Sequence, residues 1–352
     1  GWPTCSYSRN GGHTWTTPVY ASYTPGGRLI KHPRAANFVW KCSNGKFLYW
    51  FHNHGGRFVG ELGANGKDGR SPYDDRNPAW LCAGIERETP QGKVIHWSQP
   101  EILLYDDDPY IRMSYPDLVE DNGKFFVTET QKNIGRTHEI SSTLLDGLFN
   151  QWDIKTIATN SLVLNLPKDK PMPREAVMPK LSDFNKRDNS RPDHGCKDMR
   201  TGFSIDIVIQ LDTLDAGQAI LDSRDETGKG ILLSTTDTGT IKLTMNDGRS
   251  ETSWDCDKGS VQAGKTHQVT VIVDGGPKVI TFIVDGILCD GGDKRQFGWG
   301  RFSANLRTPN GTSSIRIATA LKGSVKSLRI YNRALRTSEA VGNFQSNLIK
   351  DT

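Results

Sequence analysis

The sequence has no long hydrophobic run and no cluster of basic residues. No apolar stretch approaches the roughly 20 residues that a membrane-spanning helix requires, so we expect no membrane span. Lysine and arginine together number 44 and aspartate and glutamate 40, which leaves a net charge of +4. Because this small charge is spread along 352 residues without a basic block, the sequence gives no support for a nucleic-acid partner.

Cysteine pairs of the CxxC type are also absent, although the chain contains six cysteines. Zinc sites built from such pairs are therefore not expected, and we predict no metal or organic cofactor, with calcium as the open alternative. The even number and wide spacing of the cysteines permit disulfides without requiring them. Cys256 and Cys289 lie in one strand-rich segment and form the best candidate pair, with buried free thiols as the alternative.

Helical periodicity is scarce, and short strand-like runs separated by turn residues dominate the chain. A helix is predicted over residues 142–152. Three hairpins are predicted over residues 37–53, 79–100 and 117–132, with turns at Asn44-Gly45, Gln91-Gly92 and Asn122-Gly123. The turns lie about 30 to 47 residues apart, near the length of one propeller blade.

Prolines change the character of the middle of the chain. Between residues 161 and 200 they recur in the stretch LPKDKPMPREAVMPKL. Because proline removes a ladder donor and favours extended neighbours, we predict a linker or a strap over a domain surface. From residue 201 to 350 short strands resume between Asp-Gly turns, which is typical of a β-sandwich.

Residues 8–15, SRNGGHTW, fit the pattern S-x-[DN]-x-G-x-x-W. This segment resembles the Asp box of the sialidase-type β-propeller, with Asn10 in the usual aspartate position. Ser8 and Asn10 are expected to hydrogen-bond backbone amides of a tight turn, and Gly12 to permit a positive φ. Trp15 is expected to pack between blade sheets, so we assign the motif a structural role.

Four segments of the C-terminal half resemble a laminin-G-like, concanavalin-type jelly roll. They are FSIDIVIQLDT, QAILDSRDETGKGILLSTTDTGTIKLTM, HQVTVIVDGGPKVITFIVDGILCDGG and GSVKSLRIYNRALRTSEA. The resemblance implies a sandwich that binds carbohydrate, in some such modules together with calcium. Asp222 and Asp225 are candidate calcium ligands, with solvated turn carboxylates as the alternative. The run Asp106–Asp108 is expected to be a solvated loop, with a calcium site or a charged rim as the alternatives.

The two resemblances together predict an all-β chain. A partial sialidase-like β-propeller is expected over residues 1–160, the proline-rich linker or strap over 161–200, and the concanavalin A-like/laminin G-like sandwich over 201–350.

The sialidase resemblance also implies a site. In that family an arginine triad holds the substrate carboxylate by bidentate hydrogen bonds, and a tyrosine activated by a glutamate is the nucleophile. An anionic sugar repels a carboxylate nucleophile but not a neutral phenol. Arg34, Arg76 and Arg112 each precede a predicted strand and are the candidate substrate-binding arginines. The stretch MSYPDLVE resembles the last-blade segment of sialidases, which makes Tyr115 the candidate nucleophile.

Two other arrangements remain open. Asp117 and Glu129 lie on the two arms of one predicted hairpin, so we expect them to be near cross-strand neighbours that could act as a catalytic carboxylate pair. His52 and His54 are two residues apart and are expected on one face of a strand. There they would contact substrate or serve as hydrogen-bonded structural histidines. The alternative is that they hold a metal together with Glu61 or an aspartate.

The chain departs from the sialidase pattern in having one Asp box and no Phe/Tyr-Arg-Ile-Pro signature. We therefore expect an N-terminally incomplete part of a longer enzyme. The leading hypothesis is a secreted, cell-surface or periplasmic sialidase-like glycoside hydrolase, acting on a glycan terminus and carrying a glycan-binding sandwich. The alternatives are a non-catalytic glycan-binding protein and a propeller glycosidase of another family that uses Asp117 and Glu129.

Overall fold

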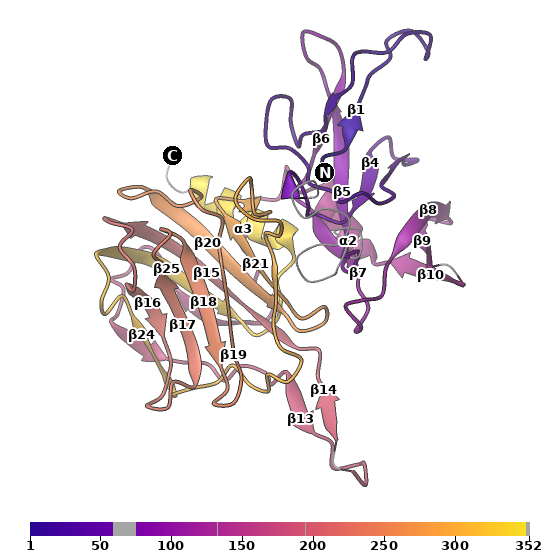
Figure 1. Ribbon diagram of the computed structural model, residues 1–352. Helices are drawn as coiled ribbons and strands as arrows, with labels where there is room; N and C mark the ends of the chain where they lie inside the picture. The colour runs from indigo at the N-terminus through magenta and orange to yellow at the C-terminus, as the bar shows by residue number, and fades with distance from the viewer. Residues whose placement is uncertain (59–74, 132, 194, 350–352) are drawn as a thin grey trace. The chain divides into compact units, whose positions relative to one another are not determined.

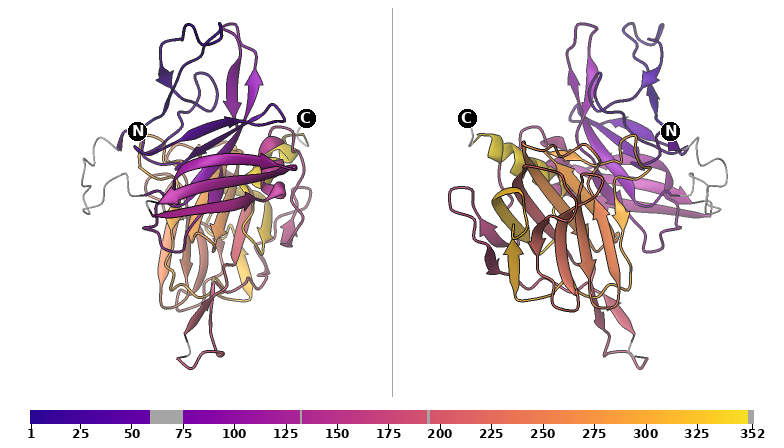
Figure 2. Two further views of the ribbon diagram at one scale, coloured as in Figure 1. Left: turned by 90° about the vertical axis from the view of Figure 1, so that its right-hand side faces the viewer. Right: turned by 60° about the vertical axis from the view of Figure 1, so that its left-hand side comes forward.

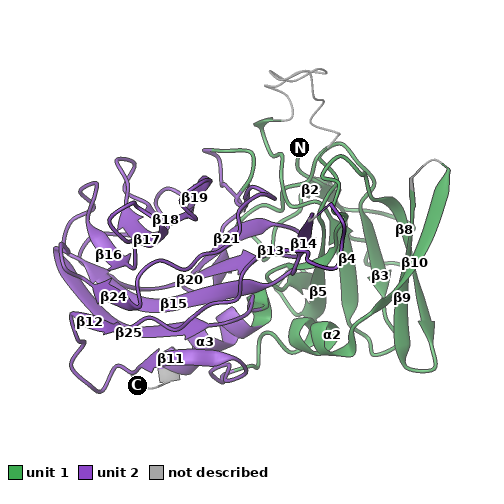
Figure 3. Cartoon of the chain, turned by 90° about the horizontal axis from the view of Figure 1, so that it is seen from below, with its two compact units in different colours: residues 1–154, 295–297, 336–338 green, residues 155–294, 298–335, 339–352 purple. Residues whose placement is uncertain are grey.

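The computed structural model describes residues 1–58, 75–131, 133–193 and 195–349 (Figure 1). The chain divides into two compact units (Figure 3). Unit 1 comprises residues 1–154, 295–297 and 336–338, and unit 2 comprises residues 155–294, 298–335 and 339–352. Both units are built from antiparallel sheets, so the all-β prediction is confirmed.

The larger sheet of unit 1 is formed by Phe38–Lys41 (β3), Phe47–Phe51 (β4), Ala79–Arg87 (β5), Val94–Trp97 (β6) and Glu101–Leu104 (β7). Its order is β3-β4-β5-β6, and β7 also pairs with β5. The first two predicted hairpins are confirmed, because β3 pairs with β4 and β5 with β6. Gly84 in β5 permits the close approach of β6, since a Cβ there would lie 2.6 Å from the Trp97 ring.

A second sheet of unit 1 has the order β10-β9-β8 and contains Ser114–Asp121 (β8), Lys124–Gln131 (β9) and Ile134–Ile140 (β10). The third predicted hairpin is confirmed. Asn122 and Gly123 have φ values of +49° and +77°, as a two-residue type I′ turn requires. The predicted helix is present as α2, Ser142–Phe149, and its buried Leu145 and Leu148 join both sheets in one apolar core.

The segment of residues 8–15 forms the hydrogen-bonded turn that its sequence predicts. Ser8 Oγ accepts a hydrogen bond from the Gly12 amide at 2.8 Å, and Asn10 Oδ1 accepts one from the Thr14 amide at 2.9 Å. The expected burial of Trp15 is wrong, because 64% of this residue is exposed. Its indole Nε1 instead donates to the Gly12 carbonyl at 3.0 Å, which holds the ring against its own turn. The turn lies between two short paired strands, Thr4–Cys5 (β1) and Val19–Tyr20 (β2).

Unit 2 contains two large sheets that lie face to face (Figure 1, Figure 2). The strands of the first are Leu162–Leu166 (β11), Gly202–Leu211 (β15), Thr266–Asp274 (β20), Val279–Val284 (β21), Ile287–Leu288 (β22), Gly300–Arg301 (β23) and Gly323–Tyr331 (β25). The strands of the second are Glu175–Val177 (β12), Ala219–Asp222 (β16), Gly230–Thr235 (β17), Ile241–Asn246 (β18), Glu251–Asp255 (β19) and Ser314–Ile317 (β24).

The strand orders are those of a β-sandwich. The seven-stranded sheet runs β11-β25-β15-β20-β21-β22, with β23 paired to β21, and the six-stranded sheet runs β12-β24-β16-β17-β18-β19. Alternate side chains point into one core, as Ile241, Leu243 and Met245 do from β18. The last element of the described residues is a helix, α3, Thr337–Ile349. Within the described residues, no helix is both long and apolar enough to cross a membrane.

Residues 161–200, expected as a linker or strap, contain four strands. β11 pairs with β25, β12 pairs with β24, and Asn185–Arg187 (β13) pairs with Cys196–Asp198 (β14). β11 and β12 thus form one edge of each sheet of the sandwich, a position that tolerates nearby proline because one side of an edge strand needs no ladder partner.

All six cysteines are free thiols, so the candidate disulfide between Cys256 and Cys289 is not formed. Both side chains are buried in the core of unit 2. Cys256 Sγ accepts a hydrogen bond from the Ile241 amide at 3.2 Å, and Cys289 Sγ accepts one from the Asp257 amide at 3.4 Å. The alternative of buried free thiols is the one found.

Asp206 on β15 is a fully buried carboxylate in unit 2. Its Oδ2 accepts hydrogen bonds from Arg329 at 3.1 Å and from Asn343 of α3 at 2.9 Å. Its Oδ1 accepts hydrogen bonds from Gln268 at 2.8 Å and Thr270 at 3.0 Å. Burial raises the pKa of Asp206, while the Arg329 charge and these hydrogen bonds lower it. The network replaces the lost hydration and attaches α3 to the sheet.

Replacing Arg329 with methionine should destabilise unit 2 by about 3–5 kcal/mol, because the Asp206 carboxylate would remain buried without its cation. Urea unfolding followed by circular dichroism measures the loss. Lys322→Met is the matched control, since the ion pair of Lys322 with Asp215 is exposed. Equal unfolding free energies of the two variants would contradict this account of Asp206.

Candidate functional site

Tyr115 stands at the start of β8 with its side chain in solvent. The residue is 69% exposed, while its neighbours Ser114 and Pro116 are buried. Its φ is +48°, in the left-handed region that a tyrosine rarely adopts. The buried neighbours on both sides therefore fix the backbone at Tyr115, while its phenol ring lies in solvent.

A bulge in the β8–β9 ladder explains this conformation. Ser114 pairs with Thr130 and Asp117 pairs with Thr128, with the register shift between them. Two residues of β8, Tyr115 and Pro116, therefore oppose the single residue Glu129 of β9. The bulge brings the backbones of the predicted nucleophile and of a predicted catalytic glutamate to the same point of the sheet.

Asp117 and Glu129, which we expected to be near cross-strand neighbours, lie on opposite faces of the sheet. The cross-strand partner of Asp117 is Thr128, and because adjacent residues of a strand point to opposite faces, Glu129 points the other way. Asp117 is exposed and accepts a hydrogen bond from Trp40 Nε1 at 3.3 Å, whereas Glu129 is 1% exposed. The ladder is regular from the Asn122-Gly123 turn as far as Asp117 and Thr128, so Glu129 lies one residue beyond the partner of Asp117, and the bulge begins only after this pair.

Glu129 is surrounded by cationic and ionisable side chains from the next strand and a loop. Its Oε1 lies 3.3 Å from Arg136 Nη1 and 3.7 Å from His138 Nε2. Arg136 Nη1 also lies 3.3 Å from Asp106 Oδ2. Glu129 Oε2 is buried and has no hydrogen-bond partner in the described part of the chain. An oriented carboxylate can accept a proton on its unpaired oxygen from a donor that lies within hydrogen-bond reach.

Arg136 and His138 were not predicted from the sequence. Arg136 is the cross-strand partner of Glu129, and His138 lies two residues further along the same strand. Recognising residues 134–140 as a third strand after the predicted hairpin would have found both. Asp106 belongs to the Asp106–Asp108 run, where its carboxylate contacts Arg136.

Of the three predicted arginines, Arg76 is attached to the start of β8. Its Nη1 donates to Ser114 Oγ at 2.6 Å, next to Tyr115. The adjacent Asn77 donates to the Asp106 and Asp108 carbonyls at 2.8 and 2.9 Å, which holds the aspartate loop beside this segment. Arg112 is half-buried in the loop before β8, and Arg34 is exposed in the loop before β3.

His52 and His54 do not share one face of a strand as expected. β4 ends at Phe51, and Asn53 between the two histidines has a φ of +50°, which breaks the alternation. The His52 ring stacks on His32 with centroids 5.5 Å apart. The His54 ring packs on Phe297 at 4.7 Å, and its Nε2 bonds the Asp75 carbonyl at 2.5 Å. His32, which the sequence analysis did not single out, is thus the direct neighbour of His52.

The sequence left open a metal site at His52 and His54 and a calcium site at Asp222 and Asp225. Among the residues that the structure describes, no three histidine, cysteine, aspartate or glutamate side chains cluster so that they could hold a metal ion. Glu61 lies outside the described residues. Asp222 accepts hydrogen bonds from Arg224 Nε at 2.9 Å and Arg316 Nη2 at 3.0 Å. Asp225 Oδ1 accepts hydrogen bonds from the Thr227 and Lys229 amides at 2.9 and 3.0 Å, as turn carboxylates do.

Burial keeps the three histidines neutral. It lowers the pKa of His32 to about 4 and that of His54 to about 3, and places the pKa of His52 well below its usual value. The positive charge of Arg76 further lowers the pKa of His32 and His52. At neutral pH these rings are therefore uncharged groups packed in the interior of unit 1.

Comparisons with known proteins agree with the sandwich fold of unit 2. Residues 189–340 match the Laminin_G_3 family, described as the concanavalin A-like lectin/glucanases superfamily. No curated protein matches the chain.

Several solved structures align with half or more of the chain at low identity. The CBM40 module of Ruminococcus gnavus IT-sialidase bound to α2,3-sialyllactose is 13% identical with a TM-score of 0.34, over 51% of this chain and 97% of the module. Trypanosoma rangeli sialidase in complex with sialic acid is 14% identical with a TM-score of 0.35, over 98% of this chain and 59% of the sialidase. The leech intramolecular trans-sialidase is 12% identical with a TM-score of 0.34, over 53% of this chain and 28% of that enzyme.

Acidification should destabilise unit 1. The folded-state pKa values of His32 and His54, about 4 and about 3, lie below the unfolded value of 6.5, so their contribution is complete above pH 6.5 and is lost as the pH falls towards those values. The loss between pH 7 and 5 should be of the order of 2 kcal/mol per histidine. Thermal unfolding at both pH values measures it.

His54→Gln should reduce this pH dependence, while the control His13→Gln, at an exposed position, should leave it unchanged. An unfolding temperature that is the same at pH 7 and pH 5 would contradict the assignment.

Proposed function

We propose that this chain is part of a sialidase-like glycoside hydrolase that removes a terminal acidic sugar from a glycan. In this proposal unit 1 is a portion of a β-propeller and carries the chemistry. The observation that supports it most directly is the bulge that sets Tyr115 opposite Glu129 in one ladder. A tyrosine and a glutamate at one point of a blade are the pair that the sequence resemblance leads us to expect.

In the proposed reaction the Tyr115 phenol is the nucleophile and Glu129 is its base. The phenolic proton moves to the Glu129 carboxylate, the tyrosine oxygen bonds to the anomeric carbon, and the glycosidic C–O bond breaks as the leaving oxygen takes a proton from water. Water then hydrolyses the glycosyl-tyrosine and restores the phenol. Arg136 and His138 are positioning residues in this scheme, because they hold Glu129 by one oxygen.

Recognition of the sugar carboxylate is assigned to Arg76, with Arg34 and Arg112 as further candidates. Arg76 contacts Ser114, the residue before Tyr115, so a carboxylate held by its guanidinium would lie near the phenol. His52 and His54 are proposed to support this segment from the interior, since both are fully buried.

Unit 2 is proposed to bind glycan. The match of residues 189–340 to the concanavalin A-like lectin/glucanases superfamily supports this role. A glycan ligand also supports a location outside the cytoplasm, either secreted, at the cell surface or in the periplasm.

Tyr115→Phe should lower the turnover of a nitrophenyl α-sialoside by at least about 100-fold, because the nucleophile is lost. A nitrophenolate leaves without being protonated, so the assay tests the nucleophile and not a general acid. Tyr110→Phe is the matched control, since Tyr110 is another exposed tyrosine of the same unit. Full activity of Tyr115→Phe would refute the tyrosine mechanism.

Glu129→Gln separates this mechanism from one based on Asp117. The glutamine variant should lose about 100-fold or more in kcat, whereas Asp117→Asn should change it less than tenfold, because Asp117 is exposed on the other face. Sialyllactose binding without any turnover, in a full-length version of the chain, would instead favour a non-catalytic glycan-binding protein.

A further inference from the structure

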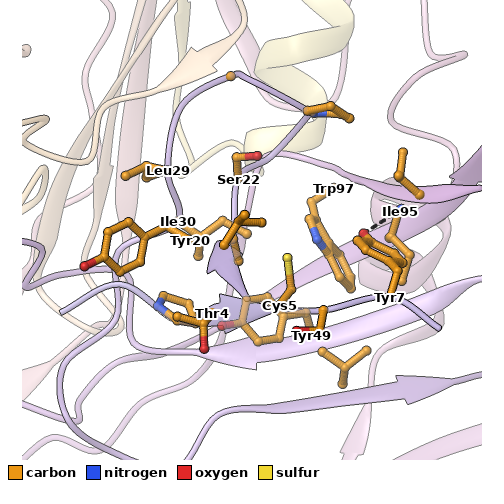
Figure 4. A pocket seen from close by; sticks show the side chains of 18 of the residues that line it. Thr4, Cys5, Tyr7, Tyr20, Ser22, Leu29, Ile30, Tyr49, Ile95 and Trp97 are labelled. Atoms are coloured by element: carbon orange, nitrogen blue, oxygen red, sulfur yellow. Dashed lines mark hydrogen bonds between the residues drawn. The ribbon is translucent and has the colours of Figure 1, made fainter. Parts of the chain in front are cut away.

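Unit 1 contains a cavity that none of the proposed catalytic residues lines. Its volume is about 730 Å³, within the usual size range of small-molecule sites. Its walls come from the N-terminal segment with β1 and β2, the loop that follows β2, and the strands β3, β4 and β6. Figure 4 shows Tyr7 and Tyr20 on opposite sides of this region, with Cys5 and Trp97 between them.

Hydrogen bonds between these elements hold the walls of the cavity together. Tyr7 Oη accepts a hydrogen bond from the Ile95 amide at 3.2 Å, which ties the N-terminal segment to β6. The Trp97 amide donates to the Tyr23 carbonyl at 2.8 Å, which ties β6 to the loop after β2. A ligand therefore meets ordered walls, which lowers the entropic cost of binding.

The lining carries several neutral polar groups on residues that solvent reaches. Apart from Tyr7 and Tyr49, five residues of the lining have a hydroxyl or an amide side chain: Thr4, Ser6, Tyr20, Ser22 and Asn37. The first, third and fifth of these are exposed, and the two serines are partly buried. Ser22 Oγ donates to the Thr24 carbonyl at 2.6 Å and keeps its lone pairs for a ligand donor. The Tyr49 hydroxyl is buried and takes no part.

Charged groups are absent from the lining. Within the described part of the chain, it contains no aspartate, glutamate, lysine, arginine or histidine. A carboxylate or an ammonium group would lose hydration there without gaining an ion pair. A neutral ligand with several hydroxyl groups can instead exchange its hydrogen bonds with water for hydrogen bonds with the neutral side chains.

Two aromatic rings of the lining are held in place by other rings. Trp97 packs against Tyr49 with ring centroids 5.3 Å apart. Tyr20 is 54% exposed, and Trp2 packs against it at 5.2 Å. The face of an aromatic ring carries partial negative charge, so it attracts the weakly positive C–H groups on one face of a sugar ring. A sugar also carries its hydroxyl groups around the edge of that ring, where neutral polar side chains can bond them.

We propose that this cavity binds a neutral hexose residue of a glycan. The rings of Tyr20 and Trp97 contact the C–H face of the sugar, and the five neutral polar side chains of the lining hydrogen-bond its hydroxyl groups. The site is independent of the proposed hydrolase activity, because it shares no residue with the Tyr115 and Glu129 ladder.

The Cys5 thiol reports on this site, because Cys5 lines the cavity and is partly exposed. Methyl β-glucoside and methyl β-galactoside are the neutral probes, and the matching uronides carry a carboxylate on the same rings. Alkylation of the unmodified protein by iodoacetamide, followed by mass spectrometry, gives the rate at Cys5. At saturation, at least one neutral probe should slow this rate about fivefold or more, because a bound ligand fills the cavity and excludes the reagent. Its uronide at the same concentration should leave the rate unchanged.

Cys196 is the internal control, since it is an exposed cysteine of unit 2. Its alkylation rate should be the same with and without each probe. The proposal is overturned if neither neutral probe protects Cys5, if a uronide protects it equally, or if Cys5 does not react in the absence of sugar.

Variants of the lining test which groups hold the sugar. Tyr20→Ala should raise the probe concentration for half-protection of Cys5 about threefold to tenfold, because the stacking ring is lost. Tyr110→Ala removes a similarly exposed ring that does not line the cavity, and should leave this concentration unchanged. Thr4→Val keeps the side-chain shape without the hydroxyl and should raise it about threefold. An unchanged Cys5 rate without sugar shows that a variant retains the cavity. Unchanged half-protection in both Tyr20→Ala and Thr4→Val would contradict the assignment.

Discussion

Two residues of β8, Tyr115 and Pro116, oppose a single residue of β9, Glu129, and the candidate active site depends on this mismatch. The extra residue cannot join the ladder, so Tyr115 takes a φ of +48° and its phenol stands in solvent. A non-glycine residue in this region costs of the order of 1–3 kcal/mol, and such conformations persist where the surroundings over-determine them. Here the buried Ser114 and Pro116, and the Arg76 guanidinium bonded to Ser114, supply that constraint.

Unit 1 combines two chemically opposite environments. The ladder around Glu129 concentrates Arg136, His138 and Asp106, which suits a reaction in which protons and charge move. The cavity walled by the N-terminal segment and the neighbouring strands has no charged side chain in its lining within the described residues. None of the proposed catalytic residues lines it.

The sequence predicted the features that are encoded locally and missed those that depend on distant partners. The hairpin at Asn122-Gly123 was predictable because the turn residues themselves adopt positive φ. The turn of residues 8–15 was predictable because Ser8 and Asn10 bond amides within four residues. The pairing of β11 and β12 was not, because their partners lie in β25 and β24, far along the chain. The bulge was missed because counting residues from a turn assumes a regular ladder.

Trapping the reaction intermediate tests the central claim most directly. In a 2,3-difluoro derivative of sialic acid, fluorine slows hydrolysis of the glycosyl-enzyme, so the attacking residue stays labelled. After incubation with the protein and proteolysis, mass spectrometry should find the added sugar on the peptide that contains Tyr115, and not in Tyr115→Phe. Turnover of a nitrophenyl α-sialoside with the label on a different residue would contradict the assignment of Tyr115 as the nucleophile.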